Sequence, residues 1–380
     1  MRILMVDLAR EWRGGQSQAL LLLRGLKTQG HAVELLAVGD SALAMKASEQ
    51  HIDVHTISGS ARRIRAAWAL SRLLRTTKFD IVHVNEAHAL TAAWLGGAHR
   101  RCRLVIARRV TFPLSSSHIS LARYRAAACI VAVSQAVRDQ LLAARIDLAR
   151  IAVVRDGVEI PALVSAQERA RARARWNVTP DEPVLAFVAA LTVEKGHALL
   201  LEAFATLQTP EFRKQLPHCR LLLAGDGVLR TTLERQAATL HISKSVIFAG
   251  FVADVREIYA ACDLFMFPPE EEGGGTSLLD AMACGLPVIA SASGGIKEIV
   301  SDQENGLLLP TRTPHSMAAA ATRLLIAPEL GIRLGAAARE TVTAQFSADR
   351  MVANTVAVFE HALLSSPRGK GRTDEPRAGH

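Results

Sequence analysis

Short apolar runs alternate with amphipathic segments along most of this chain, a pattern typical of parallel strands connected by helices. Residues 17–29 have the spacing of a helix that Gly30 ends, and Ser134 precedes a second helical pattern at residues 135–144. A further helix is expected at residues 64–75. The apolar runs of the first half, each interpreted as a strand, are residues 3–6, 33–38, 81–84, 104–107, 130–133 and the start of 153–158.

The same alternation repeats after Pro183, so the sequence predicts an α/β protein with two Rossmann-like parallel-sheet domains. Strands are expected at residues 184–190, 220–224, 246–249, 264–267 and 288–290, and helices at 198–205 and 350–364. Open sheets bind ligands beyond the carboxyl ends of their strands, so two such domains would face a cleft. The predicted divisions are an N-terminal domain at 1–165, a charged linker at 166–182, a second domain at 183–345, a helix at 346–365 that crosses back to the first domain, and a disordered tail at 366–380.

The composition is that of a globular protein, because 49% of its 380 residues are apolar. No apolar run approaches the roughly 18–20 residues that span a bilayer, and Asp7 follows the first residue too closely for a signal peptide. The five cysteines are scattered and include no C-x-x-C pair. This usage favours reduced core thiols in a cytosolic protein.

Positive charge is concentrated in the first half. Residues 1–160 carry 23 lysines and arginines against 12 acidic residues, a net charge of +11, whereas residues 161–380 carry 22 against 24, a net charge of −2. A basic half favours an anionic membrane surface or an acidic acceptor as partner, although a generic basic surface is the alternative. Nucleic acid is disfavoured, because the chain has only two tyrosines and no aromatic residues interleaved with basic ones.

The most informative chemistry lies in residues 270–285, where three glutamates run into three glycines, a hydroxyl pair and an apolar helix. Thr276 or Ser277 is expected to cap that helix at Leu278, and the helix start would bind phosphate. The carboxylates of Glu272 and Asp280 flank this start and can accept hydrogen bonds from sugar hydroxyls. The pattern predicts a site for a phosphorylated, hydroxyl-rich ligand. It argues against a glycoside hydrolase, in which a phosphate cradle has no purpose.

Three further candidates follow predicted strands. Gly14 and Gly15 precede a helix, where phosphate can approach the backbone closely, unless the pair only makes a turn. Lys195 can offset the charge of a diphosphate, with an ordinary surface lysine as the alternative. Gly225 opens the turn Gly225-Asp226-Gly227, which is expected to shape the wall of the cleft.

Polar residues also gather after two strands of the first half. They are His83, Asn85, Glu86 and His88 at the end of one strand, and Arg108 and Arg109 after the next. Such a mixture can orient an acceptor hydroxyl or an anionic acceptor, although a histidine with a structural role is equally common. We find no metal-ligand spacing, so charge stabilisation would fall to lysine, arginine and helix N-termini.

The chain up to about residue 365 resembles the family 4 glycosyltransferases of the GT-B fold. The resemblance is most specific at Glu272-Gly273-Gly274-Gly275-Thr276-Ser277-Leu278-Leu279-Asp280, which is similar to the E-x7-E signature of that family. Pro287-Val288 and the run Gly294-Gly295-Ile296-Lys297-Glu298 continue the similarity. Further matches are Gly14-Gly15, Asp156-Gly157-Val158, Glu194-Lys195-Gly196 and Gly225-Asp226-Gly227.

The resemblance implies a retaining, metal-independent enzyme that moves a sugar from a nucleotide-diphospho-sugar, with no cofactor. Glu272 would contact the donor sugar and Asp280 the ribose. Lys195, the helix start at Thr276-Ser277 and the Gly14-Gly15 loop would stabilise the departing diphosphate. The implied donor-binding residues are Gly14, Gly15, Lys195, Gly225, Glu272, Gly274, Gly275, Thr276, Ser277 and Asp280; the catalytic candidates are Glu272, Lys195, His83 and His88; and the acceptor candidates are Asn85, Arg108 and Arg109.

Two positions depart from the family pattern. Asp280 stands where the second glutamate is usual, and Ala190 stands where an arginine often precedes the lysine. One diphosphate contact is then missing or supplied elsewhere, with Arg13 and Arg109 as candidates. The expected function is transfer of a sugar to a cell-surface glycan or lipopolysaccharide-type acceptor, in the cytoplasm or at the inner face of a membrane. The alternatives are a sugar-nucleotide epimerase or phosphorylase, and a degenerate transferase that binds nucleotide-sugar as a non-catalytic partner.

Overall fold

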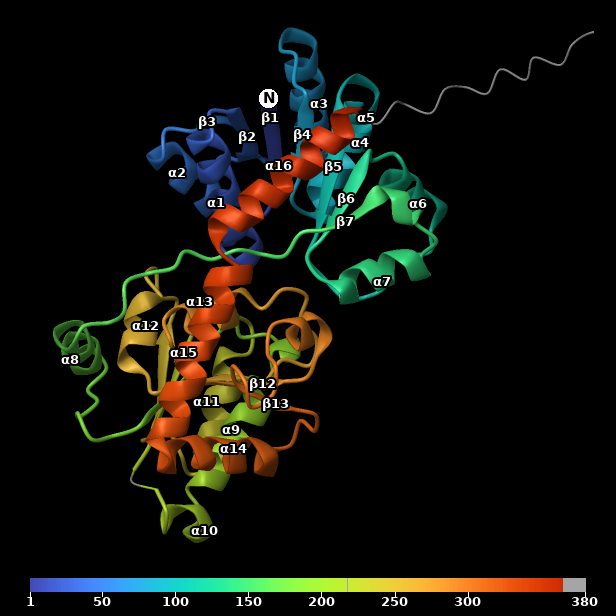
Figure 1. Ribbon diagram of the computed structural model, residues 1–380. Helices are drawn as coiled ribbons and strands as arrows, with labels where there is room; N and C mark the ends of the chain where they lie inside the picture. Colours follow the sequence, from blue (N-terminus) through green and yellow to red (C-terminus); the bar gives the residue numbers. More distant parts are fainter. Residues whose placement is uncertain (217, 365–380) are drawn as a thin grey trace, which may run out of the picture.

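The computed structural model describes residues 1–216 and 218–364, which form one parallel sheet in each half of the chain. Figure 1 shows the two halves as stacked units, the first coloured blue to green and the second mostly green-yellow to orange. This is the two-unit α/β architecture that the sequence predicts. The predicted tail at 366–380 lies outside the described residues.

The first unit is built on seven parallel strands in the order β3-β2-β1-β4-β5-β6-β7. The strands are β1 (Arg2–Asp7), β2 (Ala32–Val38), β3 (Asp53–Ile57), β4 (Ile81–Val84), β5 (Arg103–Arg108), β6 (Cys129–Ala132) and β7 (Ile151–Val153). The helices between them are α1 (Gly14–Thr28), α2 (Ala42–Glu49), α3 (Arg62–Thr76), α4 (Ala87–Leu95), α5 (Ala98–Arg101), α6 (His118–Arg125) and α7 (Gln135–Ala143), with a short 3₁₀ turn at Leu148–Arg150.

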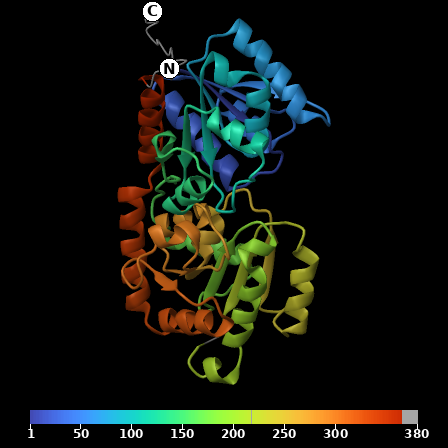
Figure 2. The same cartoon turned by 90° about the vertical axis from the view of Figure 1, so that its right-hand side faces the viewer.

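Apolar side chains on both faces of this sheet are buried, as parallel sheets require. One face packs against α3, α4, α6 and α7, and the other against α1, α2 and the last helix, α16 (Ala348–Leu364). The two views together place α3 and α16 on opposite sides of the first unit (Figures 1 and 2).

The second unit contains six parallel strands in the order β10-β9-β8-β11-β12-β13. They are β8 (Val184–Val188), β9 (Arg220–Ala224), β10 (Val246–Gly250), β11 (Leu264–Phe267), β12 (Val288–Ser291) and β13 (Leu307–Leu309). The helices are α8 (Ala166–Arg175), α9 (His197–Leu207), α10 (Pro210–Arg213), α11 (Arg230–Thr239), α12 (Arg256–Ala261), α13 (Thr276–Ala283), α14 (Pro314–Ile326) and α15 (Pro328–Gln345), with 3₁₀ turns η2 (Val193–Lys195) and η3 (Gly294–Glu298).

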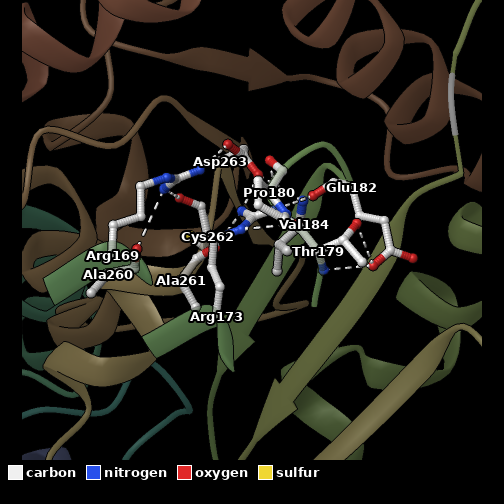
Figure 3. Close-up of polar contacts among 10 residues, drawn as sticks. All are labelled: Arg169, Arg173, Thr179, Pro180, Glu182, Val184, Ala260, Ala261, Cys262 and Asp263. Atoms are coloured by element: carbon white, nitrogen blue, oxygen red, sulfur yellow. Dashed lines mark hydrogen bonds and ion pairs between the residues drawn. The ribbon is translucent and has the colours of Figure 1, made fainter. Parts of the chain in front are cut away.

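Helix α8 packs on the second unit, although the sequence assigned residues 166–182 to a linker. Its Arg173 is buried and donates hydrogen bonds to the carbonyl oxygens of Thr179 (2.7 Å) and Ala261 (3.0 Å). The same guanidinium pairs with Asp263 at 3.2 Å (Figure 3). A buried arginine needs such partners, because its unpaired charge would be costly. This network fixes α8 against the start of the second sheet.

The chain crosses between the units twice, at neighbouring points. Val158 and Ser347 form a parallel bridge, in which the Val158 amide donates to the carbonyl oxygen of Phe346 at 2.9 Å. After the second crossing, α16 packs on α1 and buries Phe359 in the core of the first unit. Within the described residues, no helix is both long and apolar enough to cross a membrane.

Candidate active site

The first part of the site lies where β1 ends and α1 begins. The sequence suggested a loop up to residue 16, but α1 already starts at Gly14, so Gly14 and Gly15 form its first turn. Buried Asp7, the last residue of β1, accepts hydrogen bonds from Gln16 Nε2 (3.0 Å) and Asn85 Nδ2 (2.7 Å). Asn85 Nδ2 also donates to the Gly15 carbonyl oxygen at 3.0 Å. Asn85, a predicted acceptor ligand, therefore holds the start of α1 in place.

The second part of the site is the start of α13. Gly275 precedes this helix with a left-handed φ of +62°, which a glycine adopts without strain. The expected capping by Thr276 or Ser277 is wrong, because both residues lie inside the helix and no side chain caps it. The amide groups of the first turn therefore have no side-chain cap, an arrangement suited to an anion.

These two helix starts face each other across the interface between the units. A Cβ placed on Gly14 would lie 3.3 Å from Thr276 Oγ1. Neither helix has a side-chain cap or an acidic residue in its first turn. The positive ends of two helix dipoles thus converge on one place, where they favour a negatively charged ligand.

Lys195 and Glu272 lie in the same region and form an ion pair, with Nζ and Oε2 2.6 Å apart. Lys195 ends the turn η2 after β8, and Glu272 follows β11, the neighbouring strand. The Glu270 amide donates to the Glu194 carbonyl oxygen at 2.9 Å and ties the two loops together. Of the three glutamates, Glu270 and Glu271 are exposed, whereas the side chain of Glu272 is only 14% exposed.

Asp280 lies on α13 in surroundings that disfavour its charge. Burial raises the pKa of its carboxyl to about 7, and the Glu159 carboxylate adds to this shift. In the same region, the Tyr259 hydroxyl donates to the Ser277 carbonyl oxygen at 3.1 Å, which fixes the first turn of α13. Asp280 therefore changes its charge near neutral pH.

The glycine run is covered by the first unit. A Cβ on Gly273 would overlap the carbonyl oxygen of Arg109, and a Cβ on Gly274 would overlap a carboxylate oxygen of Asp156. These glycines thus have a packing reason that the sequence did not reveal, namely close approach of the two units. The predicted donor contacts of Gly274 and Gly275 stay predictions.

The two predicted acceptor arginines differ in their surroundings. Arg109 lies beside Gly15 and forms an ion pair with Asp156; burial lowers its pKa to about 10, against a raising effect from Asp7. Arg108 instead is buried in the first unit, where it donates to the Tyr124 hydroxyl at 3.1 Å and to a main-chain carbonyl. These partners inside the first unit argue against the predicted acceptor contact of Arg108, which stays a prediction.

The two predicted catalytic histidines also differ in their surroundings. His83 is buried on β4, its ring centroid 5.5 Å from that of Phe359, and neither ring nitrogen has a partner in the described structure. Burial, with a smaller effect from Arg109, lowers its pKa to about 3. A neutral ring inside the core argues against the predicted catalytic role of His83. His88 is exposed near the start of α4, which Glu86 caps.

The turn at Gly225 has a structural role in this arrangement. Gly225 has a φ of +138°, and a Cβ there would overlap the carbonyl oxygen of Ala189. The next residue, Asp226, accepts a hydrogen bond at its carbonyl oxygen from the Leu191 amide at 3.0 Å. The turn therefore fixes the backbone around Ala190, the position where the family often has an arginine.

Sequence reasoning gave no role to three acidic residues that organise the site: Asp7, Asp156 and Glu298. Glu298 ends η3 in the second unit, and its Oε1 accepts hydrogen bonds from the α7 amides of Gln135 (2.7 Å) and Ala136 (3.3 Å) in the first unit. Its Oε2 lies 3.4 Å from Arg155. The signals were present, since Asp7 directly follows the first apolar run and the other two lie in segments that resemble the family.

Solved structures share this architecture. The Anabaena protein HepE, in complex with UDP and glucose, matches with a TM-score of 0.83 and 22% sequence identity, over 95% of this chain and 100% of that chain. This likeness establishes the GT-B fold class, with its two parallel-sheet units.

Two family models match successive parts of the chain. The model described as Glycosyltransferase Family 4 covers residues 12–160, and the model described as Glycosyl transferases group 1 covers residues 168–341. The first unit is thus similar to one glycosyltransferase family model and the second unit to another.

Two curated relatives with more than 30% identity match about half of the chain. The N-acetyl-alpha-D-glucosaminyl L-malate synthase of Bacillus anthracis is 31% identical over 195 residues, which are 51% of this chain and 50% of that protein. The lipopolysaccharide core biosynthesis glycosyltransferase LpsE of Rhizobium meliloti is 33% identical over 175 residues, 46% of this chain and 49% of that protein. The chain thus spans about half the length of these relatives.

Proposed function

We propose that this protein transfers a sugar from a nucleotide-diphospho-sugar to a glycan or lipid-linked acceptor, with retention of configuration at the transferred carbon. The observation that carries the proposal is the convergence of two uncapped helix starts, at Gly14 and Thr276, beside the Lys195–Glu272 pair. Charge develops on the diphosphate as it leaves. One preorganised hydrogen-bond donor aimed at such charge stabilises the transition state by about 3 kcal/mol.

In this proposal each group has a separate part. The helix starts and Lys195 bind the diphosphate and require no metal ion, and Asp280 accepts hydrogen bonds from the ribose. Glu272 contacts hydroxyls of the donor sugar, and the tight contact of the two units excludes water. Arg109, half-buried beside Gly15, is a candidate for the phosphate contact that Ala190 cannot make.

The acceptor would bind to the first unit, near His88 at the start of α4. The similarity to LpsE favours a lipopolysaccharide-type acceptor, and the basic first unit favours an anionic acceptor or one anchored in an anionic membrane. We place the protein in the cytoplasm, at the inner face of that membrane.

Two alternative functions can be distinguished from sugar transfer by experiment. A sugar-nucleotide epimerase would convert the donor when incubated without acceptor. A degenerate transferase, suggested by Ala190, would bind nucleotide-sugar without turning it over. A thermal-shift panel of nucleotides and nucleotide-sugars identifies the donor in each case, because a ligand of the native state raises the melting temperature.

The proposal is tested by Glu272→Gln, with Glu271→Gln as the matched control. Glu271 is the neighbouring glutamate, but it is exposed and its nearest polar partner is Thr111 Oγ1 at 3.4 Å. We expect Glu272→Gln to lower the turnover rate about 100-fold or more, while donor affinity changes only a few-fold and Glu271→Gln stays near wild type. Transfer within threefold of wild type in Glu272→Gln would show that the site is assigned wrongly.

A further inference from the structure

The positive charge of the first unit comes from one stretch of the chain. Residues 58–138 contain 14 lysines and arginines and only two acidic residues, Asp80 and Glu86. The rest of residues 1–160 contains nine basic and ten acidic residues. Because α3, α4 and α6 all cover the same side of the first sheet, the excess charge lies mainly on one side of the molecule.

Helix α3 presents both apolar and basic side chains outward on this side. Ile64 and Trp68 are 69% and 67% exposed and lie four residues apart, one helical turn along the same face. Arg65, Arg72 and Arg75 are exposed on that face too, and the Arg72 guanidinium lies 5.9 Å from the centre of the Trp68 ring. We call these five residues the α3 face.

The opposite side of α3 is an ordinary core contact. Ala66, Ala67 and Leu70 are buried against the sheet and α4, so the α3 face is not a misplaced part of the core. No acidic residue lies between Ile57 and Asp80 to neutralise the arginines. Leu95, 55% exposed at the end of α4, and exposed Arg100 and Arg101 of α5 give neighbouring elements the same character.

The start of α3 contacts the loop after β1, next to the first part of the candidate active site. Arg62 at the start of α3 donates to the carbonyl oxygen of Leu8 at 3.1 Å, and Leu8 follows β1 directly. Figure 2 shows α3 along the outer edge of the first unit, on the side opposite to α16. A flat surface bound along α3 would therefore approach the candidate site at the first turn of this helix.

We propose that the α3 face docks the protein onto an anionic lipid surface. A tryptophan and an isoleucine at helical spacing can enter the boundary between headgroups and acyl chains, and the arginines complement lipid phosphates. The inference rests on the proposed function only for the purpose of docking, which is to hold the candidate site near a lipid-linked acceptor. The docking itself requires no nucleotide-sugar donor.

The test is binding of the full chain to vesicles of phosphatidylglycerol and phosphatidylcholine, measured by co-sedimentation and by tryptophan fluorescence. We expect binding that weakens with salt, is absent with phosphatidylcholine alone, and shifts the emission to shorter wavelength. The variants Ile64→Ser with Trp68→Ser, and Arg72→Gln with Arg75→Gln, should each weaken binding about tenfold or more.

Matched controls come from the second unit. Ile332 on α15 is 73% exposed, so Ile332→Ser removes an equally exposed isoleucine. Arg171→Gln with Arg235→Gln removes two exposed arginines from α8 and α11. Both controls should bind vesicles as the wild type does.

Three results would overturn the inference: no vesicle binding by the wild type, equal loss in the control variants, or self-association through α3 seen as a larger mass that the Ile64/Trp68 variant abolishes. The melting-temperature shift with nucleotide-sugar is measured on the same preparations. A normal donor shift without vesicle binding would reject the docking surface alone, and vesicle binding without any donor shift would reject the proposed function alone.

Discussion

Asp280 is the residue of the candidate site whose charge depends most on its surroundings. Its pKa is raised to about 7 by burial and by Glu159, so near neutral pH the free protein holds it partly protonated. Ribose hydroxyls that donate to this carboxylate would stabilise the ionised form. In the proposed site, donor binding is therefore expected to be linked to loss of this proton.

Donor affinity should consequently increase from pH 6 to pH 8, because the ionised fraction of Asp280 rises across this range and then levels off. Calorimetry in two buffers of different ionisation enthalpy should show proton release on binding near pH 7. Asp280→Asn should bind more weakly at pH 8 and with a flatter pH dependence. An unchanged pH dependence in the Asn variant would exclude Asp280 as the responsible group.

At the level of single residues, the sequence identified Lys195, Glu272 and the Gly14-Gly15 turn, and the structure brings them into one region. The sequence could not show which of Arg108 and Arg109 lies at the candidate site. Successive residues at a strand end point to opposite sides, so only one of two neighbouring arginines faces the second unit. The direction depends on the register of the strand, which the sequence pattern leaves open.

Among the elements, the contact of α16 with α1 depends on one glycine. A Cβ on Gly25 would overlap the side chain of Val352. Gly331 of α15 is a matched helical glycine, because a Cβ there would have its nearest neighbours, Leu324 O and Pro287, at an ordinary 3.8 Å.

Gly25→Ala should therefore destabilise the protein by about 1–3 kcal/mol through overpacking, despite the better helix propensity of alanine. Gly331→Ala should leave stability unchanged or raise it by up to about 1 kcal/mol. Thermal unfolding of the two variants measures both effects. Equal changes in stability in the two variants would mean that α16 can move away from α1 without loss of stability.

Most buried strands were predictable, because their apolar runs are short and bounded by polar residues. Strand β3 was not, since it lies at the sheet edge with a largely unburied sequence, Asp53-Val54-His55-Thr56-Ile57. The start of α13 was also wrong by two residues. Gly275, in a left-handed conformation, precedes the helix in place of the expected hydroxyl cap, and a Cβ at this position would overlap the side chain of Ile296.

For the whole molecule, Glu298 joins the two units. From the second unit it accepts two amide hydrogen bonds at the start of α7, and its charge complements the positive end of that helix. Hydrogen bonds to a charged group contribute about 1.5–3 kcal/mol to stability. We therefore expect this contact to favour the closed arrangement, in which the two units touch as observed.

Glu298→Ala should shift the protein toward an open arrangement, with a larger radius of gyration in X-ray scattering and a kcat/KM reduced about tenfold or more. Glu304→Ala is the control, since Glu304 is an exposed glutamate in the nearby turn before β13. Identical scattering curves for the Glu298→Ala variant and the wild type would show that the closed arrangement needs no such contact.

The double crossing at Val158 and Ser347 also bears on how the chain is made. The first unit is synthesised first, but the face of its sheet beside α1 is completed only by α16, which is translated after the second unit. All strands of the second unit are translated before α16. We therefore expect the later half to finish folding before the earlier one, and ribosome-bound chains that stop near residue 347 to expose the apolar groove that α16 fills.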